Sequence, residues 1–407
     1  MKFVFPLSID FAKSQGSYLH DEFTGQRYLD LFSGYASIPL GYNHPIFDAS
    51  FYHDVQQVAA LRMTNNVMSS APLRAFLEEF IPHLPSDKVH FTCTGALAVE
   101  AAIKTAMTHA HQHRSIAPSQ MQVLCLRDSF HGVNAWGFAT DRVGVTAKRM
   151  EDYPDAGWLH LAIDEALAFL SEPSAAQRTV ALLIEPIQAT NGDIHLPKAA
   201  LQALVQAAKA QGICVIVDEI QTGFGVTGTM WYSQQLGIAA DILVFGKKAQ
   251  VCGIAVAEAF ASIFSSPYQK LDVTFDGDLI DMIRARYVLK AYQRHGLLEN
   301  TANIAVFFQQ ALQPFMQTPH KPDDVFVPSQ PDSPALIANF RAAGCLIAFD
   351  LPDPALRDRF VADCFAAQLL VNKAGAHSIR LRPNLAITLD EMSSAAERMS
   401  HVLTKLR

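Results

Sequence analysis

The middle of the chain alternates between short apolar runs and longer amphipathic stretches. Ile213–Val217 is an apolar, β-branched run that ends at Asp218, and a second apolar run, Ile242–Gly246, ends at Lys247. Runs of this length predict strands that are covered on both faces of a sheet. The stretch Pro197–Gln211 has apolar residues at helical spacing and is followed by a glycine that stops the helix. Strands that alternate with helices predict a mostly parallel sheet with right-handed crossovers.

The same α/β pattern extends towards the N-terminus. Apolar runs predict further strands at Tyr28–Phe32, Val89–Phe91, Val123–Leu126 and Val180–Ile184. Helical spacing predicts helices at Pro72–Phe80 and from Gly95 onward, with Glu100 and Lys104 as an i,i+4 pair on the polar face of the second. The small residues of Ser33–Ser37 predict a flexible loop.

The character of the chain changes near residue 279. A long predicted helix, Leu279–Arg294, precedes a stretch rich in proline and polar residues, Pro314–Pro334, which predicts a loop. The later elements are predicted as a strand at Cys345–Asp350, a helix opened by Asp353, a strand at Ser378–Pro383 and a helix with capping-box spacing at Thr388. We therefore expect an N-terminal segment (1–50) that packs with a small α+β domain (279–407), and a large α/β domain (51–278).

Composition narrows the class of protein. Half of the 407 residues are hydrophobic and 17% are charged, which predicts a large buried surface in the fold or at a subunit interface. The net charge of −7 argues against a polyanion such as nucleic acid as partner. The six cysteines are scattered without metal-ligand spacing, and no apolar run reaches the length of a membrane span. We expect a cytoplasmic protein with reduced thiols and neither a metal site nor a membrane partner.

Asp218 and Lys247 are predicted to lie at the carboxyl ends of neighbouring strands, where open α/β sheets bind their ligands. Taken alone, Asp218 could be a turn or cap residue, and Lys247 a solvated loop lysine. No GxGxxG follows the first strand, and no GxxxxGK[ST] occurs. Together the two residues suit pyridoxal 5′-phosphate, which needs a lysine for a Schiff base and an acid for its protonated pyridine nitrogen.

Two further segments could complete such a site. Gly95 and Ala96 begin a predicted helix, whose free N–H groups and dipole can bind a phosphate. Phe130 is of a type more often found in a core, but its place after a strand end favours stacking on a ligand. His131 is as compatible with an ordinary loop histidine as with a catalytic group.

Five motifs make the chain resemble a known family. In chain order they are Gly95–Glu100, Val217–Gly225, Gly246–Gly253, Met282–Arg286 and Arg380–Pro383. In combination they resemble the class III (omega) aminotransferases, and most of all the L-lysine 6-aminotransferases. The resemblance covers nearly the whole chain. It implies a fold-type I pyridoxal phosphate enzyme, in which a large domain with a mostly parallel, seven-stranded-type sheet is joined to a smaller α+β domain.

The resemblance implies roles for the residues that match. Lys247 would carry the cofactor as a Schiff base, and Asp218 would bind its pyridine nitrogen. Gln221 would donate to the phenolic oxygen of the cofactor. Gly95 and Ala96 would bind its phosphate through their backbone.

Three more matches concern the ring, the partner subunit and the substrate. Phe130 would stack on the cofactor ring. Thr274 would reach the phosphate in the partner subunit, which implies an obligate homodimer with shared active sites. Arg380 would hold a carboxylate of the oxo-acid acceptor, such as 2-oxoglutarate.

Two positions depart from the lysine aminotransferase pattern. That pattern has an arginine where this chain has Val133, and the arginine holds the carboxylate of lysine. It has a glutamate where this chain has Thr190, and the glutamate pairs with the arginine that corresponds to Arg380. The departures lead to the hypothesis that the amine donor is not free L-lysine bound in the usual way.

The implied reaction is the transfer of a terminal amino group from an amine or diamino-acid-like donor to an oxo acid. Two alternatives remain open from the sequence. One is another fold-type I reaction, such as a decarboxylating transaminase or an aminomutase. The other is a catalytically silent member of the fold, against which the intact Lys247, Asp218 and Gln221 argue.

Overall fold

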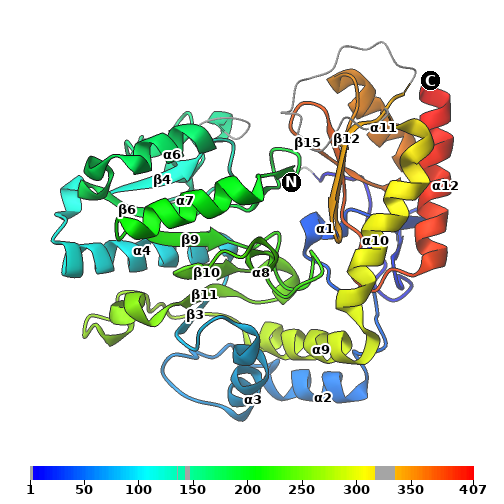
Figure 1. The fold of residues 1–407 in the computed structure, drawn as a ribbon. Coiled ribbons are helices and arrows are strands. Elements are labelled where there is room, and N and C mark those ends of the chain that lie inside the picture. Colours follow the sequence, from blue (N-terminus) through cyan, green and yellow to red (C-terminus); the bar gives the residue numbers. More distant parts are fainter. Residues whose placement is uncertain (1–2, 135, 143–146, 317–334) are drawn as a thin grey trace. The chain divides into compact units, whose positions relative to one another are not determined.

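The computed structural model describes the chain except for residues 1–2, 135, 143–146 and 317–334. The chain forms two compact units, which we describe separately (Figure 1). The larger unit contains residues 46–225 and 229–294. The smaller unit contains residues 1–45, 226–228 and 295–407. Among the described residues, no helix combines the length and the apolar character needed to cross a membrane.

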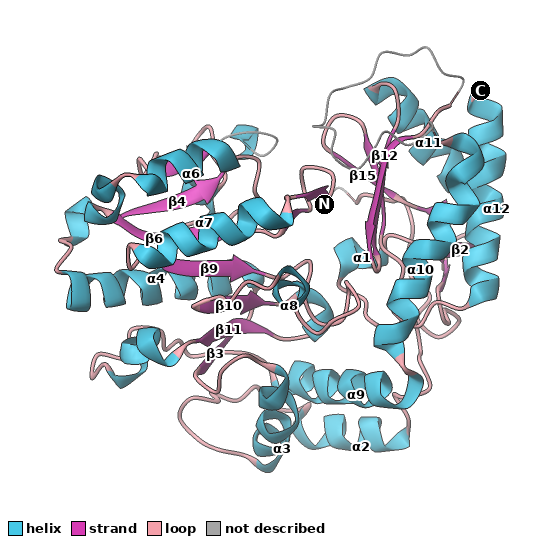
Figure 2. Ribbon diagram, viewed as in Figure 1, coloured by secondary structure: helices cyan, strands magenta, loops and turns pink. Residues whose placement is uncertain are grey.

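A seven-stranded sheet forms the centre of the larger unit (Figure 2). Its strands are, in spatial order, β3 (Val89–Thr92), β11 (Cys252–Val256), β10 (Ile242–Phe245), β9 (Cys214–Asp218), β6 (Thr179–Ile184), β4 (Gln122–Leu126) and β5 (Leu159–Leu161). The neighbours from β10 to β5 are parallel, whereas β11 is antiparallel to both β10 and β3. The predicted mostly parallel sheet is therefore confirmed.

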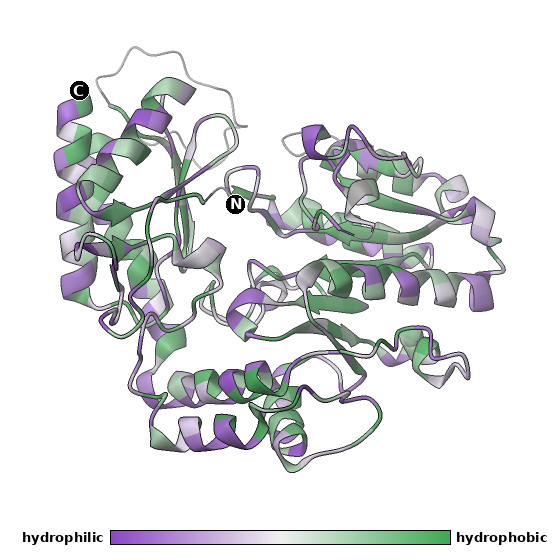
Figure 3. Ribbon diagram, turned by 180° about the vertical axis from the view of Figure 1, so that it is seen from behind, coloured by the Kyte–Doolittle hydropathy of each residue, from purple (hydrophilic) through white to green (hydrophobic). Residues whose placement is uncertain are grey.

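Helices cover both faces of this sheet. Helix α4 (Gly95–Arg114) packs on one face, and α6 (Ile163–Ser171) and α7 (Lys198–Ala210) pack on the other. Within β9, Cys214 and Ile216 belong to the first core and the intervening Val215 and Val217 to the second, as the two-residue period of a strand requires. The apolar colour of these strands in Figure 3 reflects burial on both sides.

Helix ends in the larger unit follow sequence signals. Thr94 caps α4, and the expected pair Glu100–Lys104 on this helix is formed at 3.0 Å. The predicted helix at Pro72–Phe80 is α3 (Ala71–Phe80), whose cap is Ser70. The other α-helices of five or more residues in the described part of this unit are α2 (Ala49–Val58), α8 (Tyr232–Leu236) and α9 (Leu279–His295).

The described residues of the smaller unit form an antiparallel four-stranded sheet, a mixed three-stranded sheet and three long helices. The four-stranded sheet has the order β12 (Ala338–Ala343), β13 (Leu346–Asp350), β16 (Ser378–Leu381) and β15 (Asn372–Ala374). The three-stranded sheet consists of β1 (Tyr18–His20), β2 (Arg27–Asp30) and β14 (Leu369–Leu370). The helices are α10 (Leu297–Leu312), α11 (Pro354–Ala366) and α12 (Leu389–Leu406).

The predicted caps of α11 and α12 are present. Asp353 accepts a hydrogen bond from the backbone N–H of Leu356 at 2.8 Å. Thr388 and Glu391 form the reciprocal capping box. The segment Ser33–Ser37 differs from its prediction as a flexible loop, because Ser33–Ala36 makes a tight turn in which all four residues have φ between +46° and +71°. Most of the predicted loop Pro314–Pro334 lies outside the described residues.

Candidate active site

Asp218 ends strand β9 and is almost completely buried, with 5% of its side chain exposed. Its Oδ1 accepts a hydrogen bond from the backbone N–H of Ile220 at 3.0 Å. Its Oδ2 lies 2.9 Å from Nδ1 of His131. These two contacts fix the orientation of the carboxyl group. The geometry therefore provides a fixed carboxyl group at the carboxyl edge of the sheet.

Lys247 follows the neighbouring strand, β10, at the same edge. Because β9 and β10 are parallel and Val244 pairs with Asp218, both strands end at the same edge of the sheet. Lys247 has a left-handed backbone with φ of +50°, and its carbonyl accepts from the N–H of Gln250 at 2.8 Å. A lysine in this region of backbone space costs about 1–3 kcal/mol, which the surrounding fold must offset. Such strained residues cluster at functional sites.

Six of the predicted cofactor residues line one cavity of about 210 Å³. They are Gly95, Ala96, Phe130, Asp218, Gln221 and Lys247. The wall is completed by His131, Gly132, Glu185, Ile220 and Cys252. The structure thus brings together residues from four strand ends and one helix start, as ligand sites in open α/β sheets require.

The start of α4 is shaped for close approach by a ligand. A Cβ on Gly95 would lie 2.8 Å from Cδ1 of Ile220, so a larger residue could not be accommodated without displacing that side chain. Gly132 has φ of +112°, and a Cβ there would lie 2.9 Å from Cβ of Ala96. The first backbone N–H groups of a 20-residue helix are therefore accessible from the cavity, which suits a phosphate.

A buried group of ionisable residues surrounds the acid. Oε1 of Glu185 accepts from the backbone N–H of Phe130 at 2.7 Å, and Oδ1 of Asp141 accepts from the N–H of His131 at 3.0 Å. Burial raises the pKa of Glu185 to about 8 and that of Asp141 to about 7. Burial alone would lower the pKa of His131, but the hydrogen bond and charge of Asp218, with Glu185 and Asp141, raise it.

The sequence pointed only partly to this group. Glu185 directly follows the predicted strand Val180–Ile184 and precedes a proline, but no sequence pattern predicted that it would line the cavity. His131, which the sequence left open between an ordinary loop histidine and a catalytic group, lines the cavity and bonds to Asp218. Asp141 carries no signal of its own, because it is brought in by the turn that follows the short helix α5 (Gly137–Thr140).

The cavity fits pyridoxal phosphate in its chemistry. Oε1 of Gln221 is buried without a hydrogen-bond partner among the described residues, so the amide of Gln221 has unused hydrogen-bonding capacity next to the cavity. A buried polar atom of this kind is costly unless a ligand pairs with it. With an anion in Asp218, an amine in Lys247 and a helix start at Gly95, the donor set matches the nitrogen, aldehyde and phosphate of the cofactor.

The remaining predicted residues do not line this cavity. Val133 follows the cavity residue Gly132 and is 47% exposed, and Thr190 is half-buried in the turn after β7 (Ile187–Gln188). Thr274 is exposed in the loop before α9. Arg380 is buried on β16 of the smaller unit, opposite Ala348 on β13.

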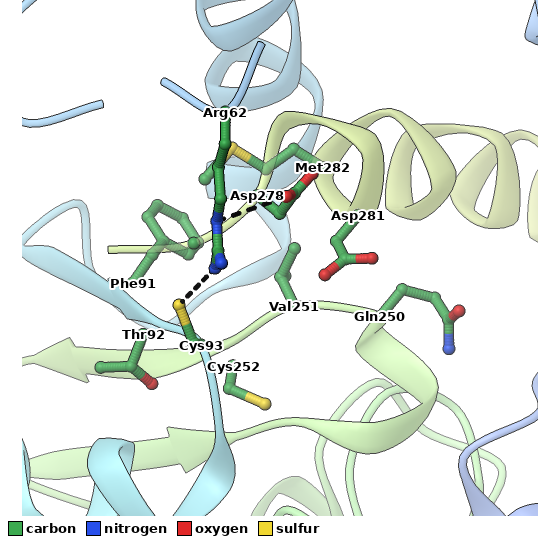
Figure 4. Close-up of a pocket in the computed structure, with 11 residues that line it drawn as sticks. Arg62, Phe91, Thr92, Cys93, Gln250, Val251, Cys252, Asp278, Asp281 and Met282 are labelled. Atoms are coloured by element: carbon green, nitrogen blue, oxygen red, sulfur yellow. Dashed lines mark hydrogen bonds and ion pairs between the residues drawn. The ribbon is translucent and has the colours of Figure 1, made fainter. Parts of the chain in front are cut away.

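A second, smaller cavity shares Cys252 with the first. Figure 4 shows Arg62 extending between Cys93 and Asp278 in this cavity. Nη2 of Arg62 lies 3.1 Å from the sulfur of Cys93, and its Nε lies 3.6 Å from Oδ2 of Asp278. The guanidinium also stacks over the ring of Phe275 at 4.3 Å. These contacts already engage Arg62, so the cavity adds no free cation to the site.

Comparisons with known proteins agree with this geometry. Residues 4–403 match the family model described as aminotransferase class-III. The L-lysine-epsilon aminotransferase of Mycobacterium tuberculosis (strain H37Rv) is 33% identical, over 95% of this chain and 89% of its own length. That of Streptomyces clavuligerus is 30% identical, over 98% and 91%. A solved lysine aminotransferase from M. tuberculosis, in the internal aldimine form, has a TM-score of 0.89 and 30% identity, and the match covers 100% of this chain and 97% of that one.

Proposed function

The chain belongs to the class III aminotransferase family, and on that premise we propose that it moves a terminal amino group from an amine donor to 2-oxoglutarate. The family and the likeness to a structure in the internal aldimine form establish pyridoxal 5′-phosphate as the cofactor. We propose in addition that the donor is an amine without the α-carboxylate of lysine, or with a carboxylate at another position. The alternatives of a decarboxylating transaminase, an aminomutase or a silent protein receive no support from the comparisons.

The roles of the chain's residues follow from their positions around the cavity. When bound, the cofactor supplies an aldehyde for amine exchange and a pyridinium that withdraws electrons from the reacting carbon. Lys247 holds the cofactor and then, as a free amine, removes the proton from the amine-bearing carbon of the donor. Asp218 would pair with the ring nitrogen and keep it protonated, because its buried carboxyl group is held in place by contacts with His131 and Ile220.

Four cavity residues orient the cofactor in this proposal. Gln221, which lines the cavity, donates its amide N–H to the phenolic oxygen. The backbone of Gly95 and Ala96 holds the phosphate at the start of α4. Phe130 contributes an aromatic wall to the cavity, and Glu185 fixes the backbone of Phe130.

The choice of donor rests on Val133, the observation that carries the proposal. Lysine aminotransferases place an arginine here to hold the carboxylate of lysine, whereas this chain has an uncharged, half-exposed side chain. Loss of a bidentate carboxylate contact costs a charged donor about 2–4 kcal/mol. A donor that lacks this carboxylate, or carries it elsewhere, therefore fits better than L-lysine.

The acceptor and the assembly complete the proposal. Thr190, which stands in place of the family's glutamate, cannot neutralise Arg380, and a cationic Arg380 would favour a carboxylate-bearing acceptor such as 2-oxoglutarate. Thr274 would contribute to the phosphate site of a partner subunit, so the active enzyme is a homodimer. We propose that the enzyme is cytoplasmic, where its six cysteines, which form no disulfide in the structure, would remain reduced.

A matched pair of donors tests the proposal. L-lysine and 1,5-diaminopentane share the same terminal amine and chain length and differ in the α-carboxylate. We expect kcat/KM for 1,5-diaminopentane to equal or exceed that for L-lysine, with one 2-oxoglutarate consumed per amine oxidised. A strong preference for L-lysine would refute the donor assignment, and turnover without an oxo acid would refute the acceptor.

A further inference from the structure

We propose that Arg149 is a specificity-determining residue, which binds a carboxylate that the amine donor carries at the end remote from its reacting amine. The inference rests on the proposed function in one respect, that the substrate of the cofactor cavity is an amine donor. It adds a cation to a site in which Val133 supplies none. The donor that it implies is an aliphatic ω-amino carboxylate.

The guanidinium of Arg149 lies next to the wall of the cofactor cavity. Its Cζ lies over the ring of Phe130, 5.4 Å from the ring centroid, which is within the range of a cation–π contact. Phe130 lines the cavity and is only partly buried, and Arg149 is exposed. Arg149 is therefore placed beside the cavity at a point that solvent, and hence a substrate, can reach.

The contact with Phe130 leaves the hydrogen-bond donors of Arg149 available. An arginine that stacks through its planar face keeps its N–H groups, which point outward in the plane of the guanidinium. The side chain of Arg149 forms no ion pair and no hydrogen bond with any other residue that the structure describes. Such an edge matches the two oxygens of a carboxylate, which it can bind in a bidentate manner.

The backbone of Arg149 is held in place by its neighbours. Arg149 ends a single helical turn, Ala147–Arg149, and the next residue, Met150, is buried. The side chain of Arg142 donates to the carbonyl oxygen of Met150, and to that of Tyr153 at 2.7 Å. The position of Arg149 is thus fixed through its backbone, while its side chain remains able to turn towards a ligand.

The cavity wall itself offers no other cation of this kind. Among the described residues that line the cavity, Lys247 is the only lysine or arginine, and its amine is needed for the cofactor. Asp218 and Glu185 are carboxyl groups, and Val133, which follows the cavity residue Gly132, is uncharged. A donor carboxylate therefore requires a cation from beside the wall, and Arg149 is placed to provide it.

The charge next to Arg149 favours a carboxylate without an adjacent amine. Lys148, the preceding residue, is also exposed and forms no ion pair with the residues that the structure describes. The α-ammonium of L-lysine would approach two cations at once, and like charges at short range repel each other. An ω-amino carboxylate lacks that ammonium, so the inference agrees with the proposed preference against L-lysine.

The test follows the first half-reaction, in which the pyridoxal form reacts with a donor in the absence of an oxo acid. 6-Aminohexanoate and 1-aminopentane are a matched pair that differs only in the carboxylate. The pairs 5-aminopentanoate with 1-aminobutane, and 4-aminobutanoate with 1-aminopropane, test shorter chains. Stopped-flow absorbance gives the limiting rate and the apparent Kd for each donor. We expect the parent to favour at least one carboxylate over its matched amine by about five- to fiftyfold.

Three variants assign that preference to a residue. Arg149→Leu should lose it through a weaker apparent Kd with little change in the limiting rate, and should react with the matched amine as the parent does. Arg149→Lys keeps the charge and should retain part of the preference. Lys148→Met is the matched control, because it removes the adjacent exposed cation, and it should keep the preference. Calorimetric titration with hexanoate, which has no amine and cannot react, should show the same loss of affinity in Arg149→Leu.

Several outcomes would overturn the inference. These are a parent without preference for a carboxylate at any chain length, an unchanged preference in Arg149→Leu, and an equal loss in Lys148→Met. If Arg149→Leu weakens only the half-reaction with 2-oxoglutarate, Arg149 binds the acceptor and the inference is again wrong.

The proposed function fails on different observations. A parent that strongly prefers L-lysine to 1,5-diaminopentane refutes the proposed donor, whereas the role of Arg149 stands if Arg149→Leu removes that preference. If no amine reacts with the pyridoxal form, the proposed function fails, and the hexanoate titration still decides whether Arg149 binds a carboxylate.

Discussion

The buried residues around the acid of the cavity and the two positions that we assign to the donor differ in burial and in polar contacts. Asp218, His131 and Glu185 are buried, and each bonds to a residue from another part of the chain. Val133 and Thr190, the donor positions, are uncharged, and Val133 is half exposed. A change in the buried group leaves a polar partner unsatisfied, whereas a change at Val133 disturbs little packing. We therefore expect the chemistry of the site and its donor specificity to depend on parts of the structure that differ in their tolerance to substitution.

The largest effect is expected from the amine of Lys247. Lys247→Ala removes both the attachment point and the proton carrier, so turnover should fall at least about 10³-fold. Borohydride reduction of the holoenzyme followed by peptide mass spectrometry should locate the cofactor on Lys247. Lys248→Met, at the adjacent lysine, is the control and should still become labelled at position 247. Normal turnover by Lys247→Ala would contradict the assignment of this cavity as the active site.

The next largest effect should come from restoring charge at the donor positions. In the double variant Val133→Arg, Thr190→Glu, we expect kcat/KM for L-lysine to rise about tenfold or more, because a new carboxylate contact is formed. The value for 1,5-diaminopentane should not rise. Steady-state kinetics with both donors measures the difference. An equal change for both donors would show that these positions do not distinguish the carboxylate.

A smaller effect concerns the pH dependence of apoenzyme stability. Burial raises the pKa of Glu185 to about 8, so the folded apoenzyme retains a proton that the unfolded chain loses above its ordinary pKa of 4.5. Stability should therefore decrease as the pH rises from about 5 to 8, with a contribution from Glu185 of up to about 1.4 kcal/mol per pH unit. His131 and Asp141, whose pKa values are also raised, act with the same sign.

Urea unfolding at several pH values measures this slope. Glu185→Gln should make the slope shallower, since the amide does not titrate. Glu165→Gln is the control, because Glu165 is half exposed on α6 and pairs with Arg127 at the surface. A slope that is unchanged in Glu185→Gln would mean that the buried carboxyl is not protonated in the folded apoenzyme.

The smallest effect is expected from shortening Val133. Val133→Ala should change the free energy of unfolding by less than about 0.5 kcal/mol and leave cofactor affinity unchanged, because the side chain is half exposed and outside the cavity wall. Chemical denaturation and cofactor titration measure both. A marked loss of cofactor affinity would show that Val133 cannot be separated, as a donor position, from the residues that bind the cofactor.

The sequence predicted best those features that depend on local pattern. The apolar runs before Asp218 and Lys247 form β9 and β10, which are parallel neighbours. A strand whose two faces are both apolar is buried in the middle of an α/β sheet, so this position was predictable. Caps at Asp353 and Thr388 were equally predictable, since a cap is a contact within four residues. Strand β12 was missed, because its sequence, Ala338–Ala343, is only partly buried and lacks an apolar run.

Side-chain contacts across the fold could not be predicted in the same way. The bond between His131 and Asp218 joins residues 87 apart, and its existence depends on the rotamer of a buried imidazole. The tight turn at Ser33–Ala36 was expected as a flexible loop, because only tertiary packing can hold non-glycine residues such as Tyr35 at positive φ. The roles of Thr274 and Arg380 stay predictions from the motifs.

Phe130 and His131 are consecutive, and their backbone N–H groups donate hydrogen bonds to carboxyl groups from two different segments of the chain. Any displacement of this dipeptide would shift the aromatic wall and the imidazole at once. A one-residue deletion there should consequently impair cofactor binding through both residues together.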